Sequence, residues 1–173
     1  MHAPGATRPV IVMGVAGSGK STLGTVLASV LGARFIEGDA FHPPENVERM
    51  RSGMPLTDAD RAGWLAALAA ELRAAEDGPV VLACSALKRS YRDLLRRGAP
   101  DARFVLLQAP MDVLARRLAE RPGHFMPASL LASQLATLEA PLPDEDALLV
   151  DATQPVDALV GQVARWIEER EGR

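Results

Sequence analysis

The residues best suited to chemistry lie between positions 14 and 21, where the sequence reads Gly-Val-Ala-Gly-Ser-Gly-Lys-Ser. This G-x-x-x-x-G-K-S spacing is that of a phosphate-binding P-loop, in which glycines let backbone amides point at phosphate oxygens. The lysine supplies a cation for the β- and γ-phosphates of a nucleotide, and the next hydroxyl is a ligand for Mg²⁺. The sequence therefore predicts an ATP–Mg²⁺ site formed by Gly14, Ala16, Gly17, Ser18, Gly19, Lys20, Ser21 and Thr22, with Ser21 as the metal ligand.

A carboxylate, Asp39, follows the second apolar segment of the chain, in the run Glu-Gly-Asp-Ala-Phe-His-Pro. At this position a carboxylate can face the P-loop phosphates, where it would position or deprotonate an acceptor hydroxyl or hold Mg²⁺ through water. The alternative is a turn residue that caps the next segment. His42, which precedes two prolines, fits a structural role as well as it fits a ligand-binding one.

Two cations, Lys88 and Arg92, follow the third apolar segment and are one helical turn apart, so they share a helix face. Two cations just beyond a strand suit the carboxylate or phosphate of a small substrate, although a solvated surface charge is the alternative. Cys84 stands near where many P-loop hydrolases have a Walker B aspartate. We expect Cys84 to be a small buried residue, because no activating partner is evident.

Between residues 45 and 64, Thr57 and Asp60 have the spacing of a capping box that opens a helix. Arg49 and Arg61 are the candidate functional residues of this stretch, and solvated charges on a helix face are the alternative.

Residues 117–127 are predicted to form a mobile lid. Arg117 and Arg121 are four residues apart, and a Pro-Gly pair at 122–123 breaks the helix after them. Arginines on a hinged segment can close over ATP and neutralise charge on the transferred phosphoryl group. The alternative is a basic helix end that favours its own dipole. The loop that contains Gln154 and Pro155 is expected to flank the adenine.

The elements that must position these residues alternate along the chain. Apolar runs predict strands at 10–13, 80–83, 104–107 and 148–150, and a further short strand is expected at 34–37. Helical patterns occur at 22–31 and at about 58–76, 88–97, 111–120, 128–138 and 156–170. Strands separated by helices predict an α/β fold with a parallel sheet of about five strands and helices on both faces. Ligands bind beyond the carboxyl ends of such strands, so the residues above should gather at one edge.

Length and composition favour a single globular domain. The chain has 173 residues, of which 48% are hydrophobic, and we assign the domain to 9–173 after a loose leader at 1–8. A net charge of −3 argues against general electrostatic attraction to nucleic acid, and the apolar stretches are too short for a membrane span. One cysteine cannot form an internal disulfide, which is typical of the reducing cytoplasm.

Longer motifs resemble those of the small gluconokinases, which are P-loop kinases with an adenylate-kinase-like fold. The motifs lie at residues 14–21 (GVAGSGKS), 38–43 (GDAFHP), 46–50 (NVERM), 55–64 (PLTDADRAGW), 84–92 (CSALKRSYR), 124–127 (HFMP) and 133–139 (SQLATLE). Two positions depart from the pattern: Gly63 stands where proline is usual, and Leu135 where phenylalanine is usual. Neither side chain is a reactive group, so the implied fold and reaction are unaffected.

The resemblance implies transfer of the γ-phosphoryl group of ATP to the 6-hydroxyl of D-gluconate, which gives 6-phosphogluconate and ADP. It implies catalytic roles for Lys20, Asp39 and Arg121, and nucleotide contacts from Arg117, Gln154 and Pro155. The residues implied to bind the acceptor are Asp39, His42, Arg49, Lys88 and Arg92. Enzymes of this kind are often homodimers, and the sequence indicates no interface.

Two other functions stay open at this point. A shikimate kinase has the same fold, but it would carry Gly-Gly-Gly after the third strand, where this chain has Cys84-Ser85-Ala86. A nucleotide-dependent switch would need no small acceptor, and it would leave Asp39, Lys88 and Arg92 without a shared purpose.

Overall fold

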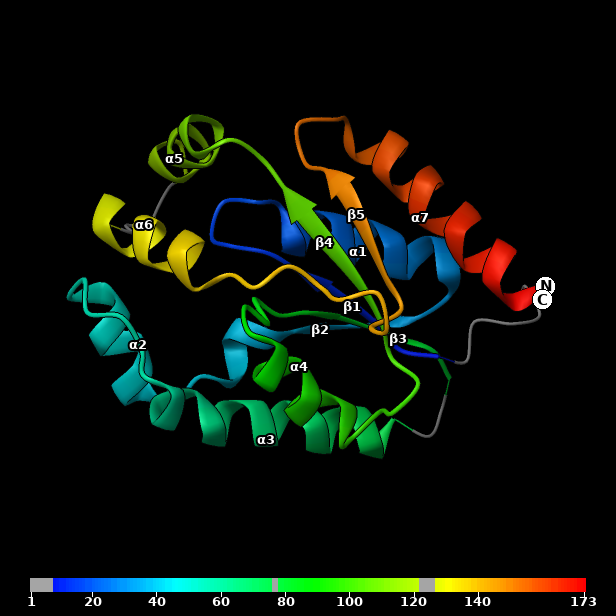
Figure 1. Cartoon of the computed structure of the whole chain (residues 1–173), viewed down its shortest axis with the longest axis horizontal. Helices are drawn as coiled ribbons and strands as arrows, with labels where there is room; N and C mark the ends of the chain where they lie inside the picture. Colours follow the sequence, from blue (N-terminus) through cyan, green and yellow to red (C-terminus); the bar gives the residue numbers. More distant parts are fainter. Residues whose placement is uncertain (1–7, 76–77, 122–126) are drawn as a thin grey trace.

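The computed structural model describes residues 8–75, 78–121 and 127–173, which contain a five-stranded sheet with helices on both faces (Figure 1). The strands are β1 (Val10–Met13), β2 (Arg34–Glu37), β3 (Val80–Ala83), β4 (Arg103–Gln108) and β5 (Ala147–Asp151). Their order is β2-β3-β1-β4-β5, and every pairing is parallel. The predicted fold class is confirmed, and β1 lies at the centre of the sheet, so the segment that follows it leaves from the middle of the carboxyl edge.

The helices follow the predicted alternation, with one addition. They are α1 (Lys20–Leu31), α2 (Pro44–Arg51), α3 (Asp58–Ala74), α4 (Arg89–Arg96), α5 (Met111–Ala119), α6 (Ala128–Thr137) and α7 (Val156–Glu171). A short 3₁₀ turn, η1 (Gly38–Phe41), joins β2 to α2. Neither η1 nor α2 was expected from apolar periodicity, and together they carry the chain from the sheet edge to α3.

Two separate cores hold the helices to the two faces of the sheet. Because side chains alternate along a strand, Ile11 and Met13 of β1 pack on one face, and Val10 and Val12 pack on the other. The first face is covered by α3 and α4, and the second by α1 and α7 (Figure 1). Both faces of a parallel sheet are thus buried, and the carboxyl edge is left to form a site.

Local signals fix where two of the helices begin and end. The Thr57 side chain accepts a hydrogen bond from the Asp60 amide, and the Asp60 carboxylate accepts one from the Thr57 amide, so the predicted capping box opens α3. Gly32 ends α1 with φ of 64°, a left-handed conformation that glycine adopts without strain. Along α3, one side of the helix is buried in the core, through Trp64, Leu65, Leu68 and Leu72.

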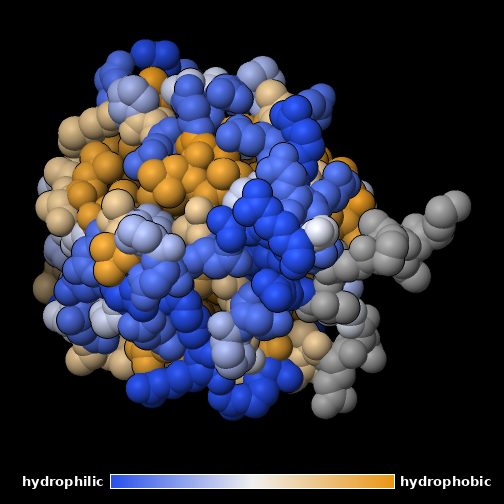
Figure 2. Space-filling model, turned by 45° about the vertical axis from the view of Figure 1, so that its right-hand side comes forward, coloured by the Kyte–Doolittle hydropathy of each residue, from blue (hydrophilic) through white to orange (hydrophobic). Residues whose placement is uncertain are grey.

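The surface is mixed in polarity. Figure 2 shows hydrophobic atoms gathered in the upper part of the visible face, among hydrophilic ones. The large hydrophobic side chains that are exposed are Val30, Val47, Met54, Met111, Leu142 and Leu149. Among the residues described, no helix combines the length and apolar character that crossing a membrane requires.

Candidate nucleotide and acceptor site

The P-loop leaves β1 and runs directly into α1. Gly17 and Gly19 have φ of 82° and 95°, values that residues with a side chain rarely adopt, and Gly19 is the residue before the first turn of α1. A Cβ atom on Gly17 would also lie 2.9 Å from the carbonyl oxygen of Leu114. The loop therefore needs glycine at these places, and it sets the positive end of the α1 dipole behind a phosphate site.

Three amides of the predicted phosphate loop already have protein acceptors. The Gly14 amide donates to the Ser85 carbonyl at 3.3 Å, the Ser18 amide to the Val15 carbonyl at 3.3 Å, and the Ala16 amide to Oε1 of Gln134 at 2.8 Å. We correct the prediction that these three amides bind phosphate, because a backbone N–H with a protein acceptor is not free for a phosphate oxygen. The Gly14 and Ala16 hydrogen bonds anchor the loop to the segment after β3 and to α6.

Lys20 is buried, and Nζ donates to the Val15 carbonyl at 3.1 Å. Burial lowers the pKa of Lys20, the charge of Asp39 raises it in opposition, and the charge of Arg121 lowers it further. These effects require both side chains to lie within electrostatic range of the ammonium. The structure thus brings together the three residues predicted to be catalytic.

Ser21, the predicted Mg²⁺ ligand, lies next to a carboxylate that the sequence analysis did not identify. Ser21 Oγ donates a hydrogen bond to the carboxylate of Glu37, the last residue of β2. Hydroxyl and carboxylate oxygens are the ligands that Mg²⁺ prefers, so the donor set fits this ion. The described residues contain no group of three or more acidic, histidine or cysteine side chains that could hold a metal unaided. The position of Glu37 at a strand end, two residues before Asp39, was the signal that could have found it.

A cavity of about 320 Å³ opens beside the P-loop. It is lined by Arg121, which was predicted to be catalytic, and by six of the predicted nucleotide-binding residues, which are Gly17, Ser18, Gly19, Thr22, Arg117 and Gln154. Pro155 is not among the lining residues; it directly precedes α7. The cavity therefore has the position that a nucleotide on the P-loop would need.

Arg117 holds two walls of this cavity together. Nη2 donates to the Ala152 carbonyl at 2.6 Å, and Nη1 donates to the Ser18 carbonyl at 3.4 Å. The guanidinium therefore joins the P-loop to the loop that follows β5.

Asp39 lies in η1, and its side chain is 71% exposed. Beside it, the His42 ring stacks on Trp64 with centroids 4.0 Å apart. The Asn46 amide group donates to Nδ1 of His42 at 3.3 Å, which leaves the proton on Nε2, at 3.9 Å from Oδ1 of Asp39. Burial lowers the pKa of His42, so the ring is neutral near pH 7. His42 therefore forms a fixed, uncharged wall next to the candidate base.

Lys88 directly precedes α4 and is about one-third exposed. Its ammonium donates to Asp58 at 3.0 Å, and the Tyr91 hydroxyl donates to the same carboxylate. These hydrogen bonds, first from Tyr91 and then from Lys88, lower the pKa of Asp58, so the pair is charged at neutral pH. Lys88 is thus accessible and cationic, as a carboxylate-binding residue must be.

The two arginines near α3 have different surroundings. Nε of Arg49 lies 3.4 Å from the Asp60 carboxylate, and the side chain is 38% exposed. Arg61 is engaged within the protein, because Nη1 donates to the Leu56 carbonyl at 2.8 Å and to the Tyr91 hydroxyl at 3.0 Å. Arg49 therefore stays a candidate for acceptor binding, whereas Arg61 has a structural role.

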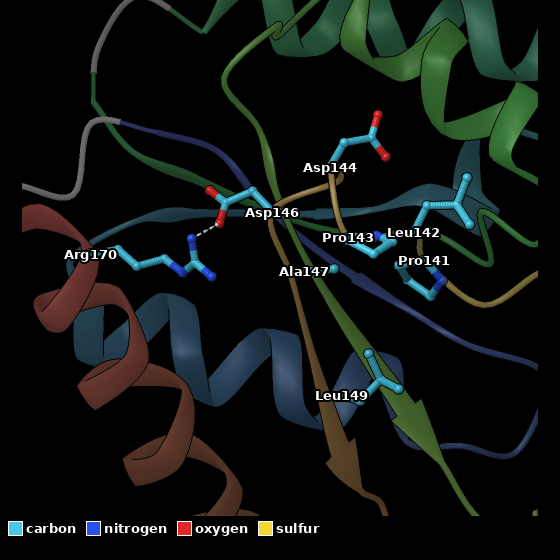
Figure 3. Close-up of a pocket in the computed structure, with 8 residues that line it drawn as sticks. All are labelled: Pro141, Leu142, Pro143, Asp144, Asp146, Ala147, Leu149 and Arg170. Carbon is cyan, nitrogen blue, oxygen red and sulfur yellow. Dashed lines mark ion pairs between the residues drawn. The ribbon is translucent and has the colours of Figure 1, made fainter.

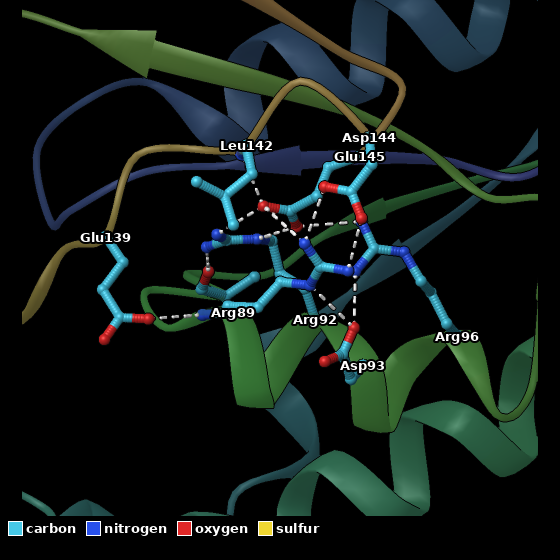
Figure 4. A network of polar contacts seen from close by, with 9 residues as sticks. Arg89, Arg92, Asp93, Arg96, Glu139, Leu142, Asp144 and Glu145 are labelled. Carbon is cyan, nitrogen blue, oxygen red and sulfur yellow. Dashed lines mark hydrogen bonds and ion pairs between the residues drawn. The ribbon is translucent and has the colours of Figure 1, made fainter.

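The prediction that Arg92 binds the acceptor does not agree with the geometry. Arg92 is fully buried, Nε and Nη2 donate to the two carboxylate oxygens of Glu145 at 2.7 and 3.0 Å, and Nη1 donates to the Ala86 carbonyl at 2.9 Å (Figure 4). Each nitrogen has an acceptor within the protein and the side chain is fully buried, so a substrate cannot reach it. Arg92 instead links α4 to the segment before β5. The prediction rested on the helical spacing of Lys88 and Arg92, and that spacing contains no information about this partner.

A second cavity, of about 400 Å³, lies far from the P-loop chemistry. It is bounded by Pro141, Leu142 and Pro143, by the first residues of β5, and by Arg170, which pairs with Asp146 (Figure 3). These residues lie at the amino end of β5, whereas the P-loop leaves the carboxyl edge of the same parallel sheet. This cavity is therefore not part of the nucleotide or acceptor site.

The predicted lid is only partly within the described residues. Arg117 belongs to α5 and Arg121 follows it, but residues 122–126, which include the predicted Pro-Gly break and most of the HFMP motif, lie outside the described ranges.

Comparisons of this chain with known proteins, by sequence and by structure, agree with one another. A family model described as an AAA domain matches residues 10–141. The chain is 50% identical to a gluconokinase of Gluconobacter oxydans over 165 residues, which cover 93% of this chain and 92% of that one. It is 43% identical to the thermoresistant gluconokinase of Escherichia coli, over 92% of this chain and 93% of that one. It also resembles the solved structure of a gluconokinase from Sinorhizobium meliloti, with a TM-score of 0.88, 47% identity, and coverage of 97% and 95%.

Proposed function

The chain belongs to the gluconokinase family of P-loop kinases, and on that basis we propose how its own residues transfer the γ-phosphoryl group of ATP to D-gluconate. The reaction is ATP-dependent phosphorylation of gluconate, and we assign the 6-hydroxyl as the acceptor group. The observation that carries the residue assignment is the cavity beside the P-loop, which Gly17, Gly19 and Arg121 line. Lys20 directly follows Gly19, and Asp39 lies within electrostatic range of its ammonium.

On the nucleotide side, we assign the cavity beside Gly17, Ser18 and Gly19 to ATP, with Arg117 and Gln154 on its walls. Lys20 would exchange its hydrogen bond to Val15 for one to the β- or γ-phosphate. Because Lys20 is desolvated, its charge acts on the phosphates with little screening. Arg121, which lines the same cavity, would neutralise charge on the transferred oxygens.

On the acceptor side, Lys88 would bind the carboxylate of gluconate, and Asp39 would accept a hydrogen bond from the 6-hydroxyl. In a loose transition state the proton leaves late, so Asp39 acts first by orienting the hydroxyl and then by taking its proton. His42 and Arg49 flank this region and are assigned to acceptor binding, His42 as a neutral wall that limits the space around Asp39.

Mg²⁺ fits the pairing of Ser21 with Glu37, and it would neutralise phosphate charge when it is bound with ATP. We also propose that the protein acts in the cytoplasm, which the single buried cysteine favours. A homodimer stays a proposal without a structural argument.

The identity to gluconokinases, 43–50% over most of the chain, favours this function over a shikimate-kinase-like one and over a nucleotide switch. The test is release of ADP by the purified protein with ATP and Mg²⁺ and with gluconate, glucose or shikimate as the acceptor. We expect release to depend on gluconate and to be far weaker with glucose, which has no carboxylate for Lys88. Preference for shikimate, or release independent of any acceptor, would contradict the proposal.

A further inference from the structure

A hydrogen bond joins the P-loop to a helix far along the chain. Oε1 of Gln134, in α6, accepts from the backbone amide of Ala16 at 2.8 Å. The two residues are 118 positions apart in sequence, so the contact is made by the fold and not by a local turn. None of the functions assigned above uses Gln134.

The residues around the Gln134 contact lead towards the proposed acceptor residues. Residues 17–19 line the nucleotide cavity, but Ala16 does not. Ala16 packs instead against the hydrophobic core on the α3 and α4 face of the sheet. Just beyond α6, the Glu139 amide donates to the Leu87 carbonyl at 2.7 Å, and Leu87 directly precedes Lys88. The helix that carries Gln134 therefore ends beside the segment that presents Lys88.

The helix that carries Gln134 packs on this same core. Leu131 is buried in it, and Leu135 packs against it from the position next to Gln134. Gln134 itself is half-buried, so part of its side chain is accessible to a ligand.

The carboxamide of Gln134 also carries an NH₂ group, which can donate hydrogen bonds. Because Oε1 faces the N–H of Ala16, the NH₂ group is on the other side of the carboxamide and carries two donors. Within the ranges 8–75, 78–121 and 127–173, the structure gives Nε2 no hydrogen-bond acceptor. The charged groups assigned to the acceptor, Lys88 and Asp39, suit its carboxylate and its reacting hydroxyl. A polyhydroxy acid has further hydroxyl groups, and a neutral amide donor suits these.

We propose that Gln134 binds the acceptor: Nε2 donates to a non-reacting hydroxyl of the sugar acid, while Oε1 is held by the Ala16 amide. The anchored carboxamide thereby fixes the acceptor chain relative to the loop that holds the phosphates. This inference rests on the proposed gluconate kinase function.

The test compares Gln134→Met, which keeps the approximate length of the side chain but has neither donor nor acceptor, with wild type on gluconate and on gluconates that lack one hydroxyl at carbons 2 to 5. For Gln134→Met we expect the gluconate KM to rise about tenfold, the size of one lost hydrogen bond, with the ATP KM nearly unchanged. One deoxy analogue should lack the hydroxyl that Gln134 binds. Its KM with wild type should be about as high as the KM of Gln134→Met for gluconate, and the substitution should not raise the KM for that analogue further.

Gln162→Met, the same substitution on α7, is the matched control and should behave as wild type. Melting temperatures of both variants show whether the fold is kept. An unchanged gluconate KM in Gln134→Met, or an equal rise for gluconate and for every deoxy analogue, would overturn the proposal, because a purely structural role affects all acceptors alike. Failure of the proposed function itself is seen separately, as wild type that does not phosphorylate gluconate.

Discussion

Two side chains at the carboxyl edge of the sheet have different surroundings: Lys20 is a desolvated cation, and Asp39 is an accessible carboxylate. Burial lowers the pKa of Lys20, and Asp39 opposes this shift. A bound phosphate would add negative charge next to Lys20, so the cation is better stabilised with ATP than without it. Asp39, exposed and next to the neutral His42 ring, is left free to meet a hydroxyl group.

Asp39→Asn keeps the shape of the side chain and removes its charge and basicity. We expect kcat to fall by about 10²–10⁴-fold, the range of general-base contributions, with little change in the KM for gluconate. Steady-state kinetics with Glu45→Gln, an exposed carboxylate in the first turn of α2, as the control would measure this. A variant with wild-type kcat would exclude Asp39 from the reaction.

Lys88→Met removes the cation assigned to the carboxylate of the acceptor. A charge-assisted hydrogen bond contributes about 1.5–3 kcal/mol, so the gluconate KM should rise tenfold or more while the ATP KM stays nearly constant. Asp58→Asn provides the matched control, because it frees Lys88 from its partner and should not weaken gluconate binding. Equal effects of both substitutions would mean that the ion pair, and not the cation, matters.

At the scale of single elements, the capping box shows how a local signal places a distant residue. Thr57 opens α3, which carries Trp64, and the Trp64 indole donates to the Gly38 carbonyl at 2.8 Å, one residue before Asp39. The start of one helix thus fixes the turn that presents the candidate base.

Thr57→Ala should lower the free energy of unfolding by about 1 kcal/mol, the usual cost of losing an N-cap. For a domain of this size the melting temperature should fall by about 2–4 °C. The control for calorimetry is Thr25→Ala, a threonine inside α1 whose hydroxyl donates to the Ser21 carbonyl. It would separate the effect of capping from simple loss of a hydroxyl. A control that falls as far as Thr57→Ala would argue against the capping contribution.

Strands β1, β2 and β3 agree with the sequence prediction residue for residue. For β1 and β3 the reason is that a continuous apolar run in a parallel sheet is bounded by clear breaks. Helix α2 could not be predicted this way. Its eight residues are mostly polar, and among them only Asn46 is buried, so there is no apolar stripe to detect. The helix depends on Pro44 at its first turn and on the Asn46 side chain, which donates to the Asp60 carbonyl at 2.9 Å.

The site was predicted best where function follows from local spacing, as in the P-loop. Arg92 was assigned wrongly because its partner, Glu145, is 53 residues away and nothing near Arg92 reveals that pairing. Gln134 was missed for the same reason, since its contact with Ala16 spans 118 residues.

For the molecule as a whole, the most consequential polar feature is the network around Glu145 (Figure 4). Arg92 and Arg96 of α4 both donate to its carboxylate, and so does the Leu142 amide. Burial alone would raise the pKa of Glu145, but these hydrogen bonds outweigh it and lower the pKa to about 2. The network joins α4 to the segment that leads into β5, the strand at one edge of the sheet.

Because the pKa of Glu145 is lowered in the folded state, the free energy of unfolding should depend on pH in the acid range. A carboxylate whose pKa is lower in the folded state stabilises fully above its ordinary value of 4.5, and this contribution is lost as the pH falls from there towards about 2. We therefore expect the free energy of unfolding, measured by urea titration, to decline across that range. Part of the decline should disappear in Glu145→Gln.

At neutral pH, Glu145→Gln should lower the free energy of unfolding by about 3–5 kcal/mol, because it leaves Arg92 buried without a counter-charge. Glu48→Gln, at an exposed ion pair on α2, is the control and should change stability by less than about 0.5 kcal/mol. A Glu145→Gln variant as stable as wild type would show that the network contributes little.

One buried atom gives the chain a property of practical value. The Cys84 sulfur is the sole thiol, it is fully buried, and burial raises its pKa to about 12. Alkylating reagents and fluorescent maleimides attack the thiolate, so they should leave the native protein unmodified. A cysteine placed at an exposed position such as Glu120, beside the proposed nucleotide cavity, would then be the one reactive group, and a dye attached there would report ATP binding without removal of any natural residue from the core.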